Sequence, residues 1–190
     1  MNIDTPLRRL GSIHVAALTD AVLTQPESAW QENRSRQEEF DVHRSTESIV
    51  LLFADVGQWP RVVVNRECGW DRLAGVAGPL MDAIVAAHYP PGGTIIRAMA
   101  ARLRAGARIA PHVDQHDSFH RGHRIHVPVT TNTGVRFTID GRPYHFEVGE
   151  AYEINNQCMH SVMNRGREDR ITFIFDYVPP EQLERLRLAS

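Results

Sequence analysis

Residues 111–126, PHVDQHDSFHRGHRIH, contain five of the ten histidines in this 190-residue chain. His112 and Asp114 are two positions apart, so in an extended segment both side chains project to one face. Such a pair can bind one metal ion through an imidazole and a carboxylate. The site needs a third, distant ligand. His160 in CMHSVMN is the best candidate, because it lies in a short strand-like segment well separated in sequence.

Two imidazoles and one carboxylate can occupy one triangular face of an octahedral ion and leave three positions open. This ligand set is typical of non-haem Fe(II) oxygenases, in which a co-substrate and dioxygen take the open positions. The pattern alone is weak, since ten histidines make chance matches easy. In the competing interpretation, His112 is a turn or surface histidine after Pro111 and Asp114 is a solvated loop acid.

Arg170 stands ten residues after His160 and strengthens the metal interpretation. A decarboxylating oxygenase of this class must hold a small dicarboxylate, with one end on iron and the other end fixed by the protein. A guanidinium suits this task because it binds a carboxylate through two hydrogen bonds and stays charged when buried. The alternative is a surface arginine paired with Glu168 or Asp169.

Other polar residues share a face with these candidates by the two-residue alternation of a strand. Arg124 and His126 in RIHVPV can both point into a cavity beside the metal and bind carboxylates of the co-substrate or of the substrate. Thr172 lies on the Arg170 face of RITFIFDYV and is assigned to the same co-substrate pocket. The alternative for Arg124 and His126 is an exposed position on an edge strand.

Two further groups of residues are candidates for other roles. The histidines in the middle of the stretch lie in a polar segment with no regular period, which is typical of a solvated loop or of a lid beside the metal; they are His116, His120 and His123. Three residues outside the stretch are candidates for binding an acidic substrate, and they are His43, Arg44 and Arg97.

The elements that must position these residues are predicted from hydrophobic periodicity. Over 94–178, short β-type runs alternate with Gly, Asn and Pro, and Asp140-Gly141 is a strong hairpin signal. The pattern predicts a mainly β fold, a β-sandwich or jelly roll, with N-terminal helices packed outside it. In the last strand, one face is apolar (Ile171, Phe173, Phe175, Tyr177) and the other carries Arg170, Thr172 and Ile174.

The N-terminal half has weaker signals. Residues 12–23 are compatible with a helix, 24–46 are polar and irregular, and 48–53 form a short apolar strand candidate. A second helix is predicted from Asp71, as N-cap, to Ala87, with an interruption at Gly78-Pro79.

Length and composition exclude several classes of protein. The chain suffices for one domain over 1–190, with a mixed portion (1–93), a jelly-roll core (94–178) and a short C-terminal helix (179–190). With 21 basic and 23 acidic side chains, no field of one sign favours nucleic acid or an anionic membrane as partner. Two cysteines exclude a disulfide scaffold. Without a signal-like or membrane-spanning segment, a soluble cytoplasmic protein is expected.

Three segments together resemble a known family: RLRAGARIAPHVD, RIHVPVTTN and VGEAYEINNQCMHSVMNRGREDRITFIFDYV. They are similar to the aspartyl/asparaginyl β-hydroxylases, which are 2-oxoglutarate- and Fe(II)-dependent oxygenases. The resemblance covers about residues 94–178. The combination of Gly-Glu, Asn-Asn, His160, Asn164 and Arg170 is its most specific part.

The resemblance implies a cupin-like double-stranded β-helix with iron inside and 2-oxoglutarate as co-substrate. His112 and His160 match the iron-binding histidines, and Arg170 matches the arginine that pairs with the distal carboxylate of 2-oxoglutarate. Arg124 and His126 match an Arg-x-His pair of the co-substrate pocket, after a longer intervening segment in this chain. The well-known animal members lack a carboxylate ligand, so Asp114 is counted as a ligand on spacing alone.

The expected function is therefore hydroxylation of an unactivated carbon with Fe(II), 2-oxoglutarate and dioxygen. The most suitable substrate is the β-carbon of an Asp- or Asn-like residue, in a peptide, on a carrier or as a free small molecule. One alternative is a hydroxylase of another small substrate such as proline. Another is a non-catalytic cupin-like metal-binding or sensor module, in which Arg170 is dispensable for ligand binding.

Overall fold

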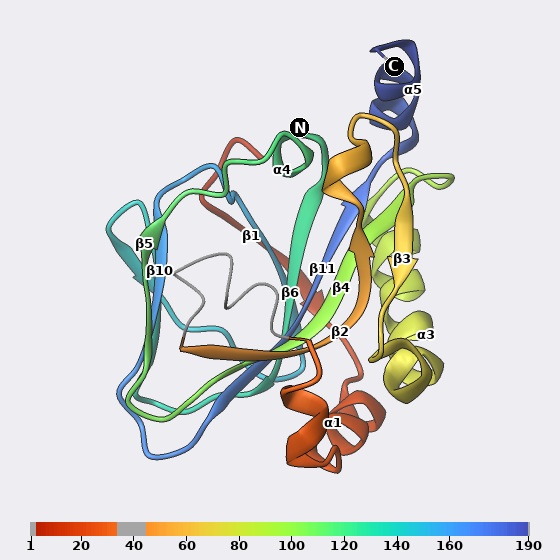
Figure 1. The fold of residues 1–190 in the computed structure, drawn as a ribbon. Coiled ribbons are helices and arrows are strands. Elements are labelled where there is room, and N and C mark those ends of the chain that lie inside the picture. The colour runs from red at the N-terminus through yellow and green to blue at the C-terminus, as the bar shows by residue number, and fades with distance from the viewer. Residues whose placement is uncertain (1–2, 34–44, 190) are drawn as a thin grey trace.

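Two antiparallel sheets face each other in the computed structural model, which describes residues 3–33 and 45–189 (Figure 1). The larger sheet contains, in spatial order, β1 (Leu7–Ser12), β9 (Glu150–Ile154), β6 (His123–Thr130), β11 (Arg170–Val178), β4 (Thr94–Leu103), β2 (Thr46–Ala54) and β3 (Val64–Arg66). The smaller sheet contains β5 (Arg108–His112), β10 (His160–Asn164), β7 (Val135–Ile139) and β8 (Arg142–Tyr144). This arrangement confirms the predicted jelly roll.

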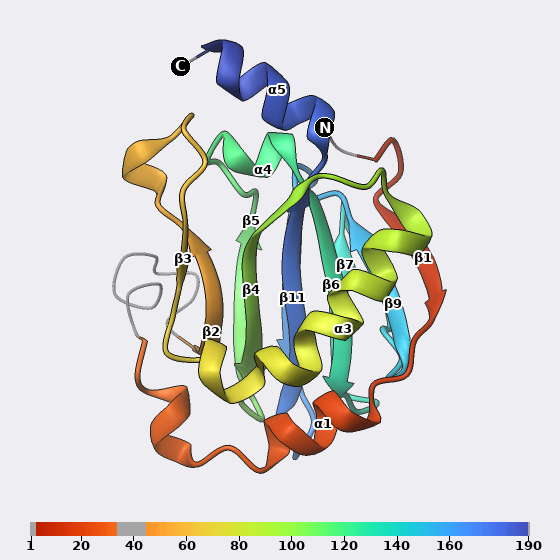
Figure 2. The same cartoon turned by 90° about the vertical axis from the view of Figure 1, so that its right-hand side faces the viewer.

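Helices cover the outer face of the larger sheet. Figure 2 shows α3 (Trp70–His88) lying across the strands, with α1 (Ala16–Leu23) at one end of them. The prediction that N-terminal helices pack outside the β core is confirmed. The remaining helical elements are short or terminal: η1 (Glu27–Trp30), η3 (Val56–Gln58), α4 (Ser118–Arg121) and α5 (Pro180–Ala189). No helix within the described ranges is long and apolar enough to cross a membrane.

The second predicted helix differs from α3 in two respects. It begins after Gly69 rather than at Asp71, and it continues through Pro79 without a break. Gly69 is required because a Cβ there would lie 2.5 Å from the carbonyl oxygen of Val50. The helix tolerates Pro79 because apolar residues on both sides of it pack on the same sheet, and tertiary packing outweighs one lost hydrogen bond. These residues are Leu73, Ala77, Leu80, Met81 and Ile84.

The N-terminal portion contributes more strands than the sequence indicates. β1, which was not predicted, adds to the edge of the larger sheet beside β9, where the side chains of Arg8 and Arg9 pair with Glu153 and Glu150. The helix predicted over 12–23 is shorter because Ser12 ends β1. The strand predicted over 48–53 extends over the whole of β2. Of the segment 24–46, residues 34–44 lie outside the described ranges.

The alternation predicted for β11 is confirmed and separates two cores. Its apolar face lies in the core between the larger sheet and the helices, where Phe173 and Phe175 are fully buried. Burial of each such side chain contributes about 1.5–3 kcal/mol. Its other face looks toward the smaller sheet, where a second core contains Phe137 and Ile154. Arg170 and Thr172 are buried on that inner face.

The hairpin predicted at Asp140-Gly141 is also confirmed. β7 and β8 pair antiparallel, with Ile139 opposite Arg142. Asp140 and Gly141 have φ angles of 49° and 75°, as the two central residues of a type I′ turn require.

Asn164 is a fully buried connection between three segments. Its amide donates to the carbonyl oxygens of Leu103 (3.2 Å) and Glu168 (2.9 Å). Its carbonyl oxygen accepts from the side-chain amide of Asn132 (3.2 Å) and from the backbone N–H of Gly166 (3.1 Å). These bonds hold the ends of β4 and β10 and the loop from which β11 starts.

Substitution of Asn164 should destabilise the fold. Asn164→Ala leaves buried backbone groups unpaired, so we expect the free energy of unfolding in urea to fall by about 2–3 kcal/mol. Asn65→Ala, at an exposed position of β3, is the matched control, with an expected change within about 0.5 kcal/mol. Equal losses in the two variants would contradict this role of Asn164.

Glu153 is a buried carboxylate of β9 that connects elements at the edge of the larger sheet. It accepts hydrogen bonds from Arg8 (2.5 Å), the Tyr89 hydroxyl (2.9 Å) and His123 Nδ1 (2.6 Å). His123 was predicted to lie in a loop or lid, but it is buried at the start of β6. The reason is that its imidazole pairs with Glu153 across the sheet.

Glu153 should make stability depend on pH. Burial alone would raise the pKa of this carboxyl, but the hydrogen bond from His123 and the charge of Arg8 outweigh burial and lower the pKa. The ionised carboxylate therefore stabilises the fold above its ordinary pKa of 4.5, and this stabilisation is lost as pH falls through the lowered value. In urea titrations between about pH 5 and 3, Glu153→Gln should lose stability less steeply than the wild type. The control is Glu184→Gln, at an exposed position of α5, which should keep the wild-type slope.

Candidate active site

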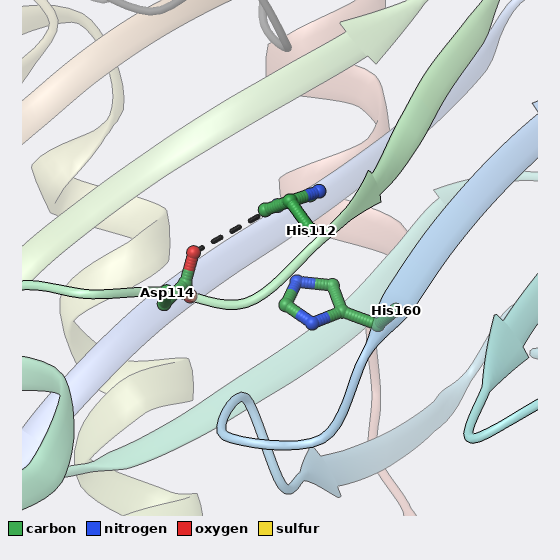
Figure 3. A group of neighbouring side chains, drawn as sticks. All are labelled: His112, Asp114 and His160. Atoms are coloured by element: carbon green, nitrogen blue, oxygen red, sulfur yellow. Dashed lines mark ion pairs between the residues drawn. The ribbon is translucent and has the colours of Figure 1, made fainter.

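The predicted metal ligands come together inside the barrel (Figure 3). His112 ends β5, His160 begins β10, and the two residues are register partners in the smaller sheet. Asp114 follows two residues after His112, and Oδ1 of Asp114 lies 3.8 Å from Nε2 of His112. One potential ligand atom from each of the three residues lies within 4.8 Å of the others. The three side chains can therefore bind a single ion.

Backbone carbonyls determine which nitrogen each imidazole presents to a metal. Nδ1 of His112 lies 2.8 Å from the carbonyl oxygen of Ala110, and Nδ1 of His160 lies 3.0 Å from that of Cys158. A carbonyl only accepts hydrogen bonds, so Nδ1 carries the proton and Nε2 carries the lone pair in each neutral ring. Burial lowers the pKa of His160 and favours this neutral form.

The turn before β10 holds the backbone of Asp114. The Asp114 N–H donates to the carbonyl oxygen of Asn156 (3.2 Å), and the side-chain amide of Gln157 donates to the Asp114 carbonyl (2.9 Å). Asn155 in turn accepts from the Gln157 N–H (3.0 Å). Asn155 and Asn156 are the Asn-Asn pair of the family resemblance, but Gln157 was missed, and its only signal in the sequence is its place beside them.

An alternating series of charges extends from Asp114 across the larger sheet. Arg124 lies 3.2 Å from Asp114 Oδ2 and donates to both oxygens of Asp176 at 2.9 Å. Arg97 lies 3.3 Å from the same Asp176 carboxylate. Burial works against a charged Arg124, but the carboxylates of Asp176 and Asp114 outweigh it and raise the pKa of Arg124. Asp176 was missed, although extending the β11 alternation by one step beyond Ile174 would have found it.

α4 covers these two arginines. The ring of Phe119 lies 4.4 Å from the Arg97 guanidinium and 4.6 Å from that of Arg124, measured to the ring centroid. The Ser118 hydroxyl accepts a hydrogen bond from Arg97 (2.8 Å) and lies 2.8 Å from Nδ1 of His116. The segment predicted as a loop or lid thus contains a short helix above the site.

The remaining predictions for histidines and substrate residues have different outcomes. His116 is half-buried beside Trp59, with ring centroids 5.7 Å apart, whereas His120 is exposed. Arg97 is buried beside the site as described above. His43 and Arg44 lie outside the described residues.

A cavity inside the barrel is lined by three of the four predicted co-substrate residues, Arg124, His126 and Arg170, whereas Thr172 is buried on β11. Its polar lining includes His112, Arg124, His126, His160 and Arg170, and its apolar lining includes Leu103, Phe137, Ile154, Val162 and Ile174. Several buried polar atoms on this side of the larger sheet have no hydrogen-bond partner among residues 3–33 and 45–189. They are Nη2 of Arg170, Oγ1 of Thr172 and both ring nitrogens of His126. Such atoms are uncommon in native proteins and point to a polar ligand.

Arg170 differs from the other two arginines that line this cavity. Arg102 pairs with Glu47 and Glu27, and Arg124 pairs with Asp176 and Asp114. Burial lowers the pKa of Arg170 to about 10, and no carboxylate among the described residues offsets it. Arg170 is only 4% exposed, which contradicts the alternative of a surface arginine.

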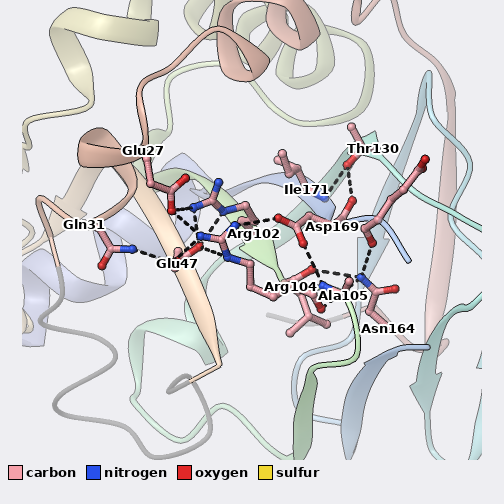
Figure 4. A network of polar contacts seen from close by, with 12 residues as sticks. Glu27, Gln31, Glu47, Arg102, Arg104, Ala105, Thr130, Asn164, Asp169 and Ile171 are labelled. Atoms are coloured by element: carbon pink, nitrogen blue, oxygen red, sulfur yellow. Dashed lines mark hydrogen bonds and ion pairs between the residues drawn. The ribbon is translucent and has the colours of Figure 1, made fainter. Parts of the chain in front are cut away.

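The network in Figure 4 explains why the neighbouring carboxylate does not neutralise Arg170. Asp169 pairs instead with Arg104 (3.2 Å) and accepts from the Ala105 N–H (2.9 Å). The Thr130 hydroxyl donates to the Asp169 carbonyl and accepts from the Ile171 N–H, at 3.0 and 2.9 Å. These contacts fix the start of β11 and leave the Arg170 side chain directed to the cavity.

Comparison with solved structures shows the fold that surrounds this site. A prolyl hydroxylase from Trichoplax adhaerens, in complex with a hypoxia inducible factor peptide fragment, has a TM-score of 0.59 and 11% identity, covering 96% of this chain and 87% of that one. An oxidoreductase of the 2OG-Fe(II) oxygenase family from Burkholderia pseudomallei has a TM-score of 0.55 and 13% identity, covering 70% and 67%. A Pseudomonas putida prolyl-4-hydroxylase has a TM-score of 0.51 and 14% identity, covering 93% and 94%.

Comparison at the level of sequence gives the family. A search of curated proteins found no match. The family model described as aspartyl/asparaginyl beta-hydroxylase matches residues 28–180, most of the chain. The chain therefore belongs to the aspartyl/asparaginyl β-hydroxylase family, and it is an enzyme of the Fe(II)- and 2-oxoglutarate-dependent dioxygenase class.

Proposed function

We propose that this enzyme binds Fe(II) through His112, Asp114 and His160, binds 2-oxoglutarate through Arg170, and hydroxylates an unactivated carbon of an amino-acid substrate. One observation carries the proposal. The buried guanidinium of Arg170, which has no carboxylate partner in the described part of the chain, lines the same cavity as His112 and His160. A dicarboxylate can connect such a cation to a metal ion.

The three proposed ligands fit Fe(II) in their chemistry. Two neutral imidazoles and a carboxylate are the ligand set of non-haem Fe(II) oxygenases. Hydrogen bonds from Nδ1 of His112 and His160 to backbone carbonyls orient the rings and increase the basicity of Nε2. When bound, Fe(II) and 2-oxoglutarate would provide the chemistry by which dioxygen oxidises a C–H bond.

The residues on the inner face of β11 and β6 fit 2-oxoglutarate. Arg170 would bind one carboxylate in a bidentate manner, and the Thr172 hydroxyl lies on the same face of the strand to donate a further hydrogen bond. The His126 imidazole is buried beside them, and burial and the charge of Arg170 hold its pKa well below the ordinary value. A neutral His126 can donate one hydrogen bond to the co-substrate.

The apolar side chains that line the cavity exclude water from the proposed reaction site. Leu103, Phe137 and Ile154 line the cavity beside the polar groups. Low polarity around the ion pairs strengthens them, and exclusion of water protects reactive species from side reactions.

The proposed substrate is an Asp- or Asn-like residue, hydroxylated at its β-carbon, in a peptide, on a carrier or as a free amino acid. Family membership supports this choice. Arg97, a candidate for binding an acidic substrate, is buried beside Asp176 and under Phe119. A screen for 2-oxoglutarate turnover should include aspartyl, asparaginyl and prolyl peptides and the free amino acids. Stimulation by proline alone would overturn the substrate assignment.

Arg170→Ala should weaken the binding of 2-oxoglutarate. Removing one partner of a buried charge pair costs about 2 kcal/mol or more, so we expect roughly 30-fold or greater loss of affinity in calorimetric titration of the Mn(II)-loaded protein. Arg170→Lys should fall between this variant and the wild type, because a lysine keeps the charge but not the bidentate geometry.

The control is Arg136→Ala on β7, where the side chain is exposed and the affinity should stay within about twofold. An unchanged affinity in Arg170→Ala, or a wild type without succinate formation from 2-oxoglutarate, would instead support a non-catalytic metal-binding module.

His160→Ala should abolish tight metal binding. Loss of one of three protein ligands is expected to weaken Mn(II) or Co(II) binding by at least about 100-fold in anaerobic titrations. His145→Ala is the matched control, because His145 is 39% exposed and outside the barrel cavity. Equal affinities of the two variants would refute His160 as a ligand.

A further inference from the structure

Asp176 lies between two arginines on the inner face of the larger sheet. Its register partners are Arg97 on β4 and Arg124 on β6, so the three side chains project from neighbouring strands. Arg124 Nε donates to Asp176 Oδ1 and Arg124 Nη2 to Oδ2, both at 2.9 Å. A bidentate pair of this kind fixes the plane of the guanidinium. Asp176 therefore holds Arg124 in one orientation.

The third nitrogen of this guanidinium reaches the carboxylate that is proposed to bind the metal. Nη1 of Arg124 lies 3.2 Å from Oδ2 of Asp114, which makes an ion pair but does not meet hydrogen-bond geometry. The other oxygen, Oδ1, lies 3.8 Å from Nε2 of His112, on the side of the imidazoles (Figure 3). The two oxygens of Asp114 thus face different partners, a cation on one side and the metal ligands on the other.

We propose that Arg124, held by Asp176, is a positioning residue that restricts Asp114 to binding the metal through one oxygen. This inference rests on the proposed function. A carboxylate bound through both oxygens would occupy two positions of an octahedral ion, and with two imidazoles it would leave about two positions open instead of three. Chelation of the co-substrate and binding of dioxygen together need all three. Arg124 keeps the third position open by attracting Oδ2 through this ion pair.

The chemistry of arginine suits this role. One planar guanidinium can contact the carboxylates of Asp176 and Asp114 at the same time, whereas the ammonium of a lysine is a single point charge. Phe119 covers the Arg124 guanidinium at 4.6 Å, and shielding from water strengthens the ion pairs beneath it. Arg97 provides a comparison inside the same cluster, because it pairs with Asp176 but directs its Nη2 to Ser118 at 2.8 Å.

This role differs from the one that the sequence resemblance implied. Arg124 was expected to bind the co-substrate, but each of its three nitrogens contacts a carboxylate of the chain itself. The two interpretations predict different results for Arg124→Gln. A positioning residue affects the metal site before 2-oxoglutarate is added, whereas a co-substrate residue affects only the binding of 2-oxoglutarate.

The test counts the water ligands of Mn(II) in the protein without 2-oxoglutarate, by the EPR line broadening that ¹⁷O-enriched water causes. The wild type should retain about three water ligands and Arg124→Gln about two, with Mn(II) affinity lowered by about 10- to 100-fold. Arg97→Gln, which removes the other arginine from Asp176, should keep the wild-type water count. If Arg124→Gln has the wild-type count and Mn(II) affinity, the proposal is wrong. Loss of 2-oxoglutarate affinity alone would then assign Arg124 to the co-substrate.

Asp176→Asn provides an independent variant, because Asp176 pairs with Arg97 and Arg124 and Asn has nearly the same shape as Asp without its charge. It should shift the water count and the Mn(II) affinity in the same direction as Arg124→Gln, and thermal melting checks that each variant is folded. If Arg124→Gln does not fold, a wild-type Mn(II) site in Asp176→Asn overturns the proposal. Failure of the unmodified protein to bind Mn(II) would refute the proposed function itself. If both variants keep the water count and the Mn(II) affinity of the unmodified protein, only this inference is refuted.

Discussion

Charged groups buried between the two sheets need counter-charges, because an unpaired charge in an apolar interior is costly. Asp114, Arg124, Asp176 and Arg97 meet this requirement among themselves by alternating in sign across the inner face of the larger sheet. Arg170, on the same face, does not find a carboxylate among the described residues. The proposed place of 2-oxoglutarate follows from this imbalance, because Arg170 lines the same cavity as His112 and His160, two of the three side chains proposed to bind the metal.

The central strand β11 connects that site to the stability of the whole domain. Its outer face is part of the core under the helices, through Phe173 and Phe175, and its inner face carries Arg170 and Asp176. Any shift of β11 along its neighbouring strands would therefore move Arg170 and also Asp176, which pairs with Arg124. The buried contacts of Asn164 and the pairing of Asp169 with Arg104 hold the start of this strand, so stability and site geometry depend on the same contacts.

Much of the fold and part of the site could be predicted from local patterns. The two-residue spacing of His112 and Asp114 brought both to the site, the alternation in β11 separated the core face from the polar face, and Asp140-Gly141 marked a hairpin. The strand β1 and the uninterrupted helix α3 were not predicted, since each depends on packing against distant segments. Pro79 is unfavourable inside an isolated helix, but it is tolerated in α3 because the helix packs on the sheet. Charged side chains argue locally against a strand at β1, but Arg8 and Arg9 pair there with Glu153 and Glu150.

The sequence by itself determined the chemical types present and the faces on which they lie, because side-chain direction along a strand follows from a period of two. The tertiary structure alone decided the partners: Asp176 between Arg97 and Arg124, Glu153 beside His123, and Gln157 on the backbone of Asp114. These pairs join residues 30 to 79 positions apart. The register of one strand against another sets such pairs, and register results from packing of the whole sheet rather than from any local pattern.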